Sequence, residues 1–173
     1  DKAFKRSRYI VFAEDRSFQY FTFREYLAYV AASYGVPLPD VSGLVNGFHF
    51  EDYTNVLLKE LSTGNLKKAY LITAFALRPK LLLLDEPVSG IDQNGMELFF
   101  KTMDYLKKHY DLAIILISHD LDYVARYADH VVLLDKTVLR QGTVKEVYES
   151  SEFERIFSAG KEETWIKEDE TND

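Results

Sequence analysis

The sequence predicts an α/β fold: a parallel sheet that carries helices, with a largely helical first part. Apolar runs at residues 9–13, 81–84, 113–117 and 131–134 have the length of strands. The segments between the later runs carry apolar residues at helical spacing. Alternation of strand and helix over residues 80–135 is typical of a parallel sheet with right-handed crossovers.

The first part is predicted to be a strand followed by three helices. The pattern Thr22 to Glu25 has the form of a capping box and should open the first helix, which Gly35 and Pro37 end. Residues 36–49 are rich in Gly and Pro and are predicted to be a loop. The two remaining helices are expected over 51–60 and 62–77.

The later part is predicted to continue from strand to helix. We expect the apolar runs 81–84 and 113–117 to be strands buried on both faces, because no polar residue interrupts them. The other expected elements are helices at 94–109 and 121–127, strands at 131–134 and 137–140, and a short helix opened by the capping box 143–146. Residues 161–173 are mostly polar and are expected to fray.

Composition excludes several classes of protein. The chain has 173 residues, a net charge of −7 and no dense cluster of Lys and Arg, which argues against nucleic-acid binding. It has no Cys, so disulfides and cysteine metal sites are excluded. No apolar run is long enough to span a membrane and no signal peptide opens the chain, so we expect a cytoplasmic location. Because it starts without Met, close to a strand, we expect it to be part of a longer protein.

Two adjacent acids give the strongest chemical signal. Asp85 and Glu86 follow the four leucines 81–84 directly, at the carboxyl end of a strand, where open α/β sheets bind ligands. In phosphoryl transfer an acid at such a strand end holds Mg²⁺, and a second carboxylate can polarise the attacking water. The alternative is a strand that simply ends in polar residues.

Three further segments become informative when their order along the chain is considered. Ser62 to Asn65 can cap a helix or bind an anion at its N-terminus, Ser89 to Asp92 form a turn, and His119 follows the strand 113–117. Taken singly, each has an ordinary structural explanation. Together with Asp85 and Glu86, they resemble the ATPase domain of ABC proteins over residues 8–150. The segments match the signature motif (here LSTGN), the Walker B strand, the D-loop and the switch histidine.

This resemblance implies a P-loop NTPase (RecA-like) core with an ABC helical subdomain. Residues 1–21 and 80–160 would form the core, 22–79 the helical subdomain and 161–173 a flexible acidic tail. The family pairs two ATPase domains head to tail on a transmembrane permease subunit, at the inner face of the cell membrane. The cofactors implied are ATP and Mg²⁺.

The resemblance also implies a role for each site residue. Asp85 would bind Mg²⁺, Glu86 would be the general base and His119 would contact the γ-phosphate. The signature residues Ser62, Thr63, Gly64 and Asn65 would face ATP held by the partner domain, and Asp92 would link the two sites. Glu14 stands where the family has the Q-loop Gln, as a possible ligand of Mg²⁺. The aromatic stretch 18–21 sits where the family docks on its membrane subunit.

One expected motif does not occur in the chain. No G-x-x-x-x-G-K-[ST] P-loop occurs, so we expect this stretch alone to bind ATP poorly. In the family the P-loop strand lies between the strands predicted at 113–117 and 131–134. Without it, we expect the gap to be closed by collapse, a partner chain or strand exchange. The alternatives to a transporter subunit are a soluble ABC ATPase of translation or DNA repair, or a non-catalytic binding module.

Overall fold

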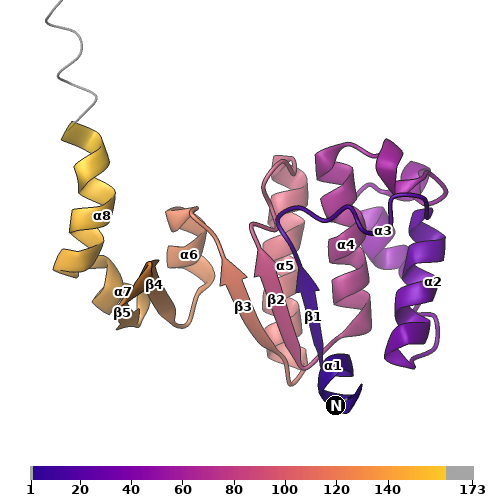
Figure 1. Ribbon diagram of the computed structural model, residues 1–173, viewed down its shortest axis with the longest axis horizontal. Coiled ribbons are helices and arrows are strands. Elements are labelled where there is room, and N and C mark those ends of the chain that lie inside the picture. The colour runs from indigo at the N-terminus through magenta and orange to yellow at the C-terminus, as the bar shows by residue number, and fades with distance from the viewer. Residues whose placement is uncertain (1, 163–173) are drawn as a thin grey trace, which may run out of the picture. The chain divides into compact units, whose positions relative to one another are not determined.

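The computed structural model describes residues 2–162, which form two compact units. The first ends at His119 and the second begins at Asp120. Figure 1 shows the elements in chain order. The first unit contains α1 (Lys2–Arg6), β1 (Arg8–Val11), α2 (Phe23–Tyr34), α3 (Ser42–Gly47), the 3-10 turns η1 (Glu51–Tyr53) and η2 (Leu58–Glu60), α4 (Thr63–Leu77), β2 (Leu81–Asp85), α5 (Gln93–His109) and β3 (Ala113–Ile117).

The three strands of the first unit form a parallel sheet in the order β1-β2-β3. This confirms the α/β prediction, and the apolar run 81–84 supplies the central strand. Leu82 and Leu84 of β2 are fully buried. The prediction that β3 is buried on both faces is wrong, because Ile115 and Ile117 are 49% and 48% exposed. Among the described strands only β2 pairs with β3. How the other edge of β3 is covered in the intact protein therefore stays a prediction.

Local capping signals placed the helix ends correctly. The Thr22 side chain accepts a hydrogen bond from the backbone of Glu25, whose carboxylate reaches back to the backbone N–H of Thr22, which completes the predicted capping box. Gly35 ends α2 in the left-handed conformation, with φ 71°. The Ser62 side chain caps α4 in the same way, accepting from the backbone of Asn65.

Two predictions in the helical part are wrong. Residues 42–47, predicted as loop, form α3, which no side chain caps. The helix predicted over 51–60 is instead the two short turns η1 and η2. Tertiary contacts explain both: Phe48, which follows α3, is fully buried, and the backbone N–H of Leu58 bonds to the carbonyl of Phe21.

A row of aromatic rings joins the helical part to the core beside the sheet. Phe75 of α4 lies with its ring centroid 6.4 Å from that of Phe48 and 5.8 Å from that of Phe99 in α5. Phe99 in turn packs edge to face on Phe100. All four rings are buried, so the C-terminal part of α4 packs both on the residue that follows α3 and on α5.

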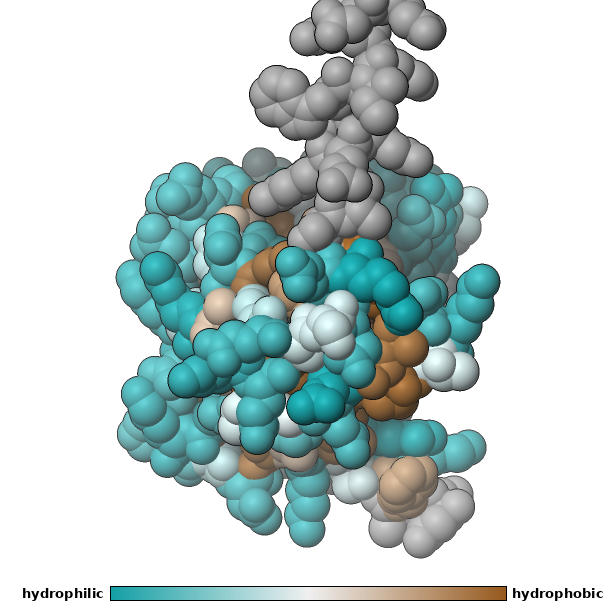
Figure 2. All heavy atoms as spheres, turned by 90° about the vertical axis from the view of Figure 1, so that its left-hand side faces the viewer, coloured by the Kyte–Doolittle hydropathy of each residue, from teal (hydrophilic) through white to brown (hydrophobic). Residues whose placement is uncertain are grey.

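The second unit contains α6 (Leu121–Tyr127), β4 (Val131–Asp135), β5 (Thr137–Gly142), α7 (Val144–Tyr148) and α8 (Ser151–Glu162). β4 pairs antiparallel with β5 in a sheet of their own, which corrects the prediction that residues 131–134 continue a parallel alternation. A tight turn at Lys136, whose φ is 61°, connects the two strands. Apolar side chains of β4 and β5, among them Leu134 at 66%, are exposed. Figure 2 shows brown, apolar surface among teal on the face that it draws. Residues 163–173 of the predicted tail lie outside the described residues.

Candidate functional site

Glu86 and His119 meet at the carboxyl ends of two neighbouring parallel strands. Asp85 is the last residue of β2 and pairs in register with Ile117, the last residue of β3. The backbone N–H of Glu86 donates to the carbonyl of Ile117 at 3.0 Å, which extends the strand pairing by one bond. The sequence order of the two strands therefore places the acidic pair beside the histidine, as predicted.

The Glu86 carboxylate is held by His119 through two contacts. Its Oε1 lies 2.7 Å from Nδ1 of His119 and accepts a second hydrogen bond, at 3.1 Å, from the His119 backbone N–H. An ionised carboxylate can only accept, so Nδ1 carries the hydrogen in this arrangement. The second ring nitrogen, Nε2, takes no part in these two contacts. The His119 side chain is 83% exposed, whereas that of Glu86 is 24% exposed.

The backbone of Glu86 adopts an uncommon conformation. Its φ is 44°, in the left-handed region that residues other than glycine seldom occupy. Such a conformation costs about 1–3 kcal/mol and persists where surrounding contacts fix it. One of these contacts comes from Lys67 of α4, whose Nζ donates to the Glu86 carbonyl at 2.6 Å.

Lys67 lies among the acidic residues of the site. It is 5% exposed, and burial lowers the pKa of its ammonium, while the carboxylates of Glu86, Asp85 and Glu14 act in the opposite direction. A buried ammonium needs such partners, because desolvation without them is costly. The site thus contains a fixed positive charge that the sequence did not predict.

The signature segment packs on the D-loop turn of the same chain. Ser62 and Thr63 are exposed, and Ser62 caps α4. A Cβ built on Gly64 would lie 2.4 Å from the carbonyl oxygen of Gly90, so only glycine fits at this position. Gly90 itself has φ 78°, which suits the turn before α5. The predicted ligand-facing glycine therefore also has a packing role within its own chain.

Asp92 connects the D-loop to α4. Its Oδ1 accepts from the backbone N–H of Gly95 at 2.9 Å and so caps α5, and its Oδ2 accepts from Nζ of Lys68 at 2.7 Å. The Lys68 side chain is 8% exposed. The bond from Lys68 and then the bond from Gly95 hold the pKa of the Asp92 carboxyl below its usual value. Hence Lys67 and Lys68 contact opposite ends of the 86–92 segment.

Replacing Asp92 by Asn is expected to destabilise the chain in a pH-dependent way. Asn still caps a helix but leaves the buried Lys68 ammonium without its carboxylate. The ion pair with Asp92, whose carboxyl pKa is lowered, stabilises the fold above about pH 4 and is lost as the pH falls through the lowered pKa.

Urea unfolding midpoints measured between about pH 3 and pH 7 test this expectation. Near neutral pH the unfolding midpoint of Asp92→Asn should lie at a lower urea concentration than that of the wild type, and this difference should shrink in acid. Asp104→Asn, which removes an exposed pair with Lys108, is the matched control. A deficit no larger than in this control would contradict the role given to Lys68.

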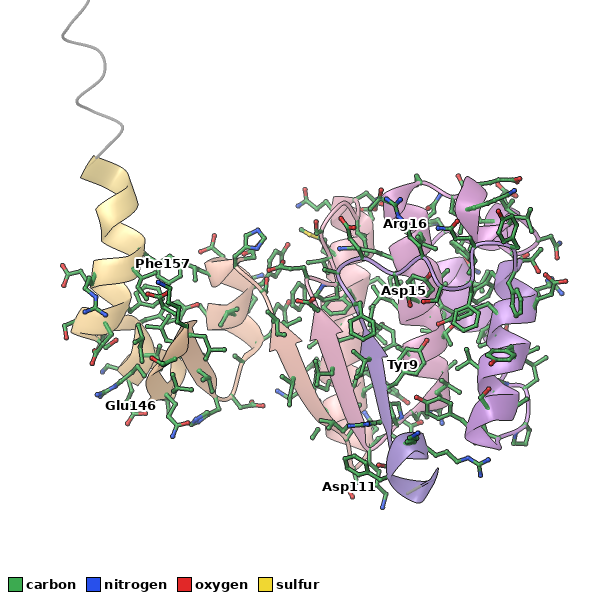
Figure 3. The ribbon with its side chains drawn as sticks, viewed as in Figure 1. Tyr9, Asp15, Arg16, Asp111, Glu146 and Phe157 are labelled. Atoms are coloured by element: carbon green, nitrogen blue, oxygen red, sulfur yellow. The ribbon has the colours of Figure 1, made fainter. Side chains whose placement is uncertain are left out.

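A separate cleft of about 420 Å³ opens between the loop after β1 and the N-terminal end of α4. Its lining includes Glu14, Gln19, Thr63 and Lys67. Asp15, labelled in Figure 3, belongs to the same loop. Glu14 is exposed here, and both Glu14 and Gln19 reach the cleft. The cleft thus brings the Q-loop segment next to the signature helix, while Glu86 and His119 do not line it.

Comparison with known proteins gives the family. Residues 3–125 match the family described as "AAA domain, putative AbiEii toxin, Type IV TA system". The zinc import ATP-binding protein ZnuC of Agrobacterium fabrum is 35% identical over 123 residues, which are 70% of this chain and 41% of that protein. The chain is an ABC-type nucleotide-binding domain of the AAA-domain family.

Other ABC proteins share its sequence and fold. The energy-coupling factor transporter ATP-binding protein EcfA2 of Enterococcus faecalis is 35% identical over 95 residues, which are 54% of this chain and 33% of that protein. A solved ATP-binding subunit of an ABC transporter has the same fold, with TM-score 0.78 and 24% identity over 91% of this chain and 65% of the other. CbiO1 of Clostridium perfringens gives TM-score 0.64 with 26% identity over the same shares. The chain spans less than half the length of the two sequence relatives.

The side chains present fit a magnesium nucleotide. Within residues 2–162 no three His, Asp or Glu side chains converge as a closed metal site. Mg²⁺ is commonly held by one or two carboxylates, with phosphate oxygens and water completing its shell, so the half-buried carboxylate of Asp85 is a suitable ligand. None of the described helices has the length and apolar composition needed to cross a bilayer.

Proposed function

We propose that this nucleotide-binding domain is the ATP-hydrolysing part of an ABC transporter subunit. The contact between Glu86 and His119, next to Asp85, carries the proposal. At this edge of the sheet the Glu86 carboxylate contacts the His119 imidazole, and Asp85, whose carboxylate could bind Mg²⁺, precedes Glu86. Bound Mg²⁺ would neutralise phosphate charge. The names of the relatives, which are ATP-binding proteins of transporters, support the same function.

Each residue of the site would have its own role in ATP hydrolysis. Glu86, held by His119 through Oε1, accepts a proton from the attacking water on its second oxygen, which makes neither of the two contacts with His119. Because Nδ1 of His119 donates to the carboxylate, Nε2 is left for the γ-phosphate, and it would donate to a phosphate oxygen from the protonated ring, since phosphate oxygens only accept. The side of the γ-phosphate opposite His119 would face Ser62 and Gly64 of a second domain. Asp92 would link the two sites.

The partners follow from the same proposal. A second ATPase domain completes each site head to tail, and a transmembrane permease receives the motion. The aromatic residues after β1 support such a docking face, since Tyr20 and Tyr29 are 75% and 51% exposed. The protein would then lie in the cytoplasm, peripheral to the inner face of the membrane.

Mixing two inactive variants of the intact protein tests the shared site. Glu86→Gln damages the chemistry of its own chain, whereas Ser62→Arg blocks the exposed helix end offered to the partner. In a mixed dimer one site has both defects and the other has neither. Equal mixing should therefore restore Mg²⁺-dependent ATP hydrolysis to about a quarter of the wild-type rate. An active wild type without recovery on mixing would contradict a head-to-tail site, and an inactive wild type would contradict hydrolysis itself.

A further inference from the structure

We infer that Lys67 is a positioning residue for Glu86. From α4, its ammonium holds the Glu86 carbonyl and thereby sets the direction in which the carboxylate faces His119. The inference deepens the proposed function and rests on it for the catalytic consequence. Its structural part, that Lys67 keeps Glu86 in an uncommon backbone conformation, is independent of any activity.

Both peptide groups that flank the Cα of Glu86 are anchored. The N–H before it donates to the Ile117 carbonyl of β3 at 3.0 Å, and the carbonyl after it accepts from Nζ of Lys67 at 2.6 Å. Fixing these two groups fixes both backbone dihedrals and with them the direction of the Cβ. The left-handed φ of 44° needs such restraint, because a glutamate released from it relaxes to a commoner region.

The bond from Lys67 is suited to this restraint because it is part-buried and charge-assisted. Lys67 is 5% exposed, and a hydrogen bond from an ammonium is stronger than one from a neutral donor. The same ammonium interacts electrostatically with the carboxylates of Glu86, Asp85 and Glu14, which favour its charged form. An apolar side chain at position 67 would fill the space but would leave that carbonyl with only the longer bond, at 3.3 Å, from the backbone N–H of Ser89.

Lys67 also connects the two halves of the proposed site. It lies on α4 within one turn of Gly64, which packs against the Gly90 carbonyl, and next to Lys68, which binds Asp92. The first turns of α4 therefore contact the 86–92 segment at its start, at its turn and at its end. If α4 shifts when its N-terminus meets a nucleotide of the partner domain, Lys67 transmits that shift to Glu86.

The test compares Lys67→Met, Lys67→Gln and Lys67→Arg in the intact protein, with Lys101→Met on the exposed face of α5 as control. In Lys67→Met, kcat for ATP hydrolysis should fall about 10- to 100-fold with an unchanged KM, because the carboxylate is misplaced while nucleotide contacts remain. Lys67→Arg keeps a cationic donor and should recover most of this loss. Lys101→Met should match the wild type.

Hydrogen exchange supplies a readout that does not need activity. The amide of Glu86, which bonds to Ile117, should lose protection about tenfold or more in Lys67→Met, while the amides inside β2 stay protected. Lys67→Gln offers a neutral donor, so the exchange rate of its Glu86 amide should lie between those of Lys67→Met and the wild type. If Lys67→Met does not fold, Lys67→Gln takes its place in the comparison.

Two results would overturn the inference: wild-type exchange at Glu86 without the Lys67 amine, or equal losses in Lys67→Met and Lys67→Arg, which would indicate packing alone. If the wild-type protein hydrolyses no ATP, the proposed function fails, and the exchange data alone decide the role of Lys67.

Discussion

Glu86→Gln in the intact protein is expected to lower kcat for ATP hydrolysis by about 10²- to 10⁴-fold while ATP stays bound. The amide oxygen of the new side chain can still accept both hydrogen bonds that His119 makes to Glu86 Oε1, so the geometry should survive. An amide cannot take a proton from water, so the chemical step is lost. The ATP-bound dimer should therefore accumulate.

Phosphate release and sedimentation with ATP and Mg²⁺ measure these two consequences. Glu97→Gln, a change of the same type in an exposed pair on α5, is the control and should leave both unchanged. Unchanged steady-state hydrolysis in Glu86→Gln would rule out Glu86 as the base. Loss of hydrolysis with loss of ATP binding would point instead to a structural role.

Gly64→Ala is expected to have the second large effect, through packing. The new methyl group would lie 2.4 Å from the Gly90 carbonyl oxygen, which belongs to the backbone and cannot turn aside as a flexible side chain could, so α4 must move away from the turn. Such overpacking costs about 1–3 kcal/mol of unfolding free energy. Hydrolysis should fall as well, because the same shift moves Lys67 and Lys68 relative to the 86–92 segment.

Gly43→Ala gives the matched control, because a Cβ at Gly43 meets no atom within 4 Å. Alanine is the better helix former by up to about 1 kcal/mol, so this variant should be as stable as the wild type or slightly more stable. Urea unfolding of the two variants measures the difference. Equal stability of Gly64→Ala and Gly43→Ala would contradict the close packing between α4 and the D-loop turn.

Elements with local signals could be predicted from the sequence. The capping box at Thr22, the cap at Ser62 and the uninterrupted leucines of β2 depend on neighbouring residues only, and the structure confirms them. α3 has two glycines in six residues and no side-chain cap, so tertiary contacts alone define it. The exposure of β3 likewise depends on which strands and helices lie beside it, and no local pattern reports that.

The candidate site was predictable in its acids and its histidine but not in its lysines. Parallel neighbours end at the same edge of a sheet, so the strand order alone brings Glu86 to His119. Lys67 and Lys68 were missed because their partners, Glu86 and Asp92, are 19 and 24 residues away. Their one signal was two consecutive lysines in an otherwise apolar helix, since a buried lysine requires a partner. The left-handed backbone of Glu86 leaves no trace in residue type.

The structure of the intact Glu86→Gln protein with ATP and Mg²⁺ tests the central claim most directly, that Asp85, Glu86 and His119 handle a magnesium nucleotide. We predict Mg²⁺ beside Asp85, the γ-phosphate facing Nε2 of His119, and Ser62 of a second copy on the opposite side of that phosphate. A nucleotide bound at another edge of the sheet, with His119 facing solvent, would contradict the account.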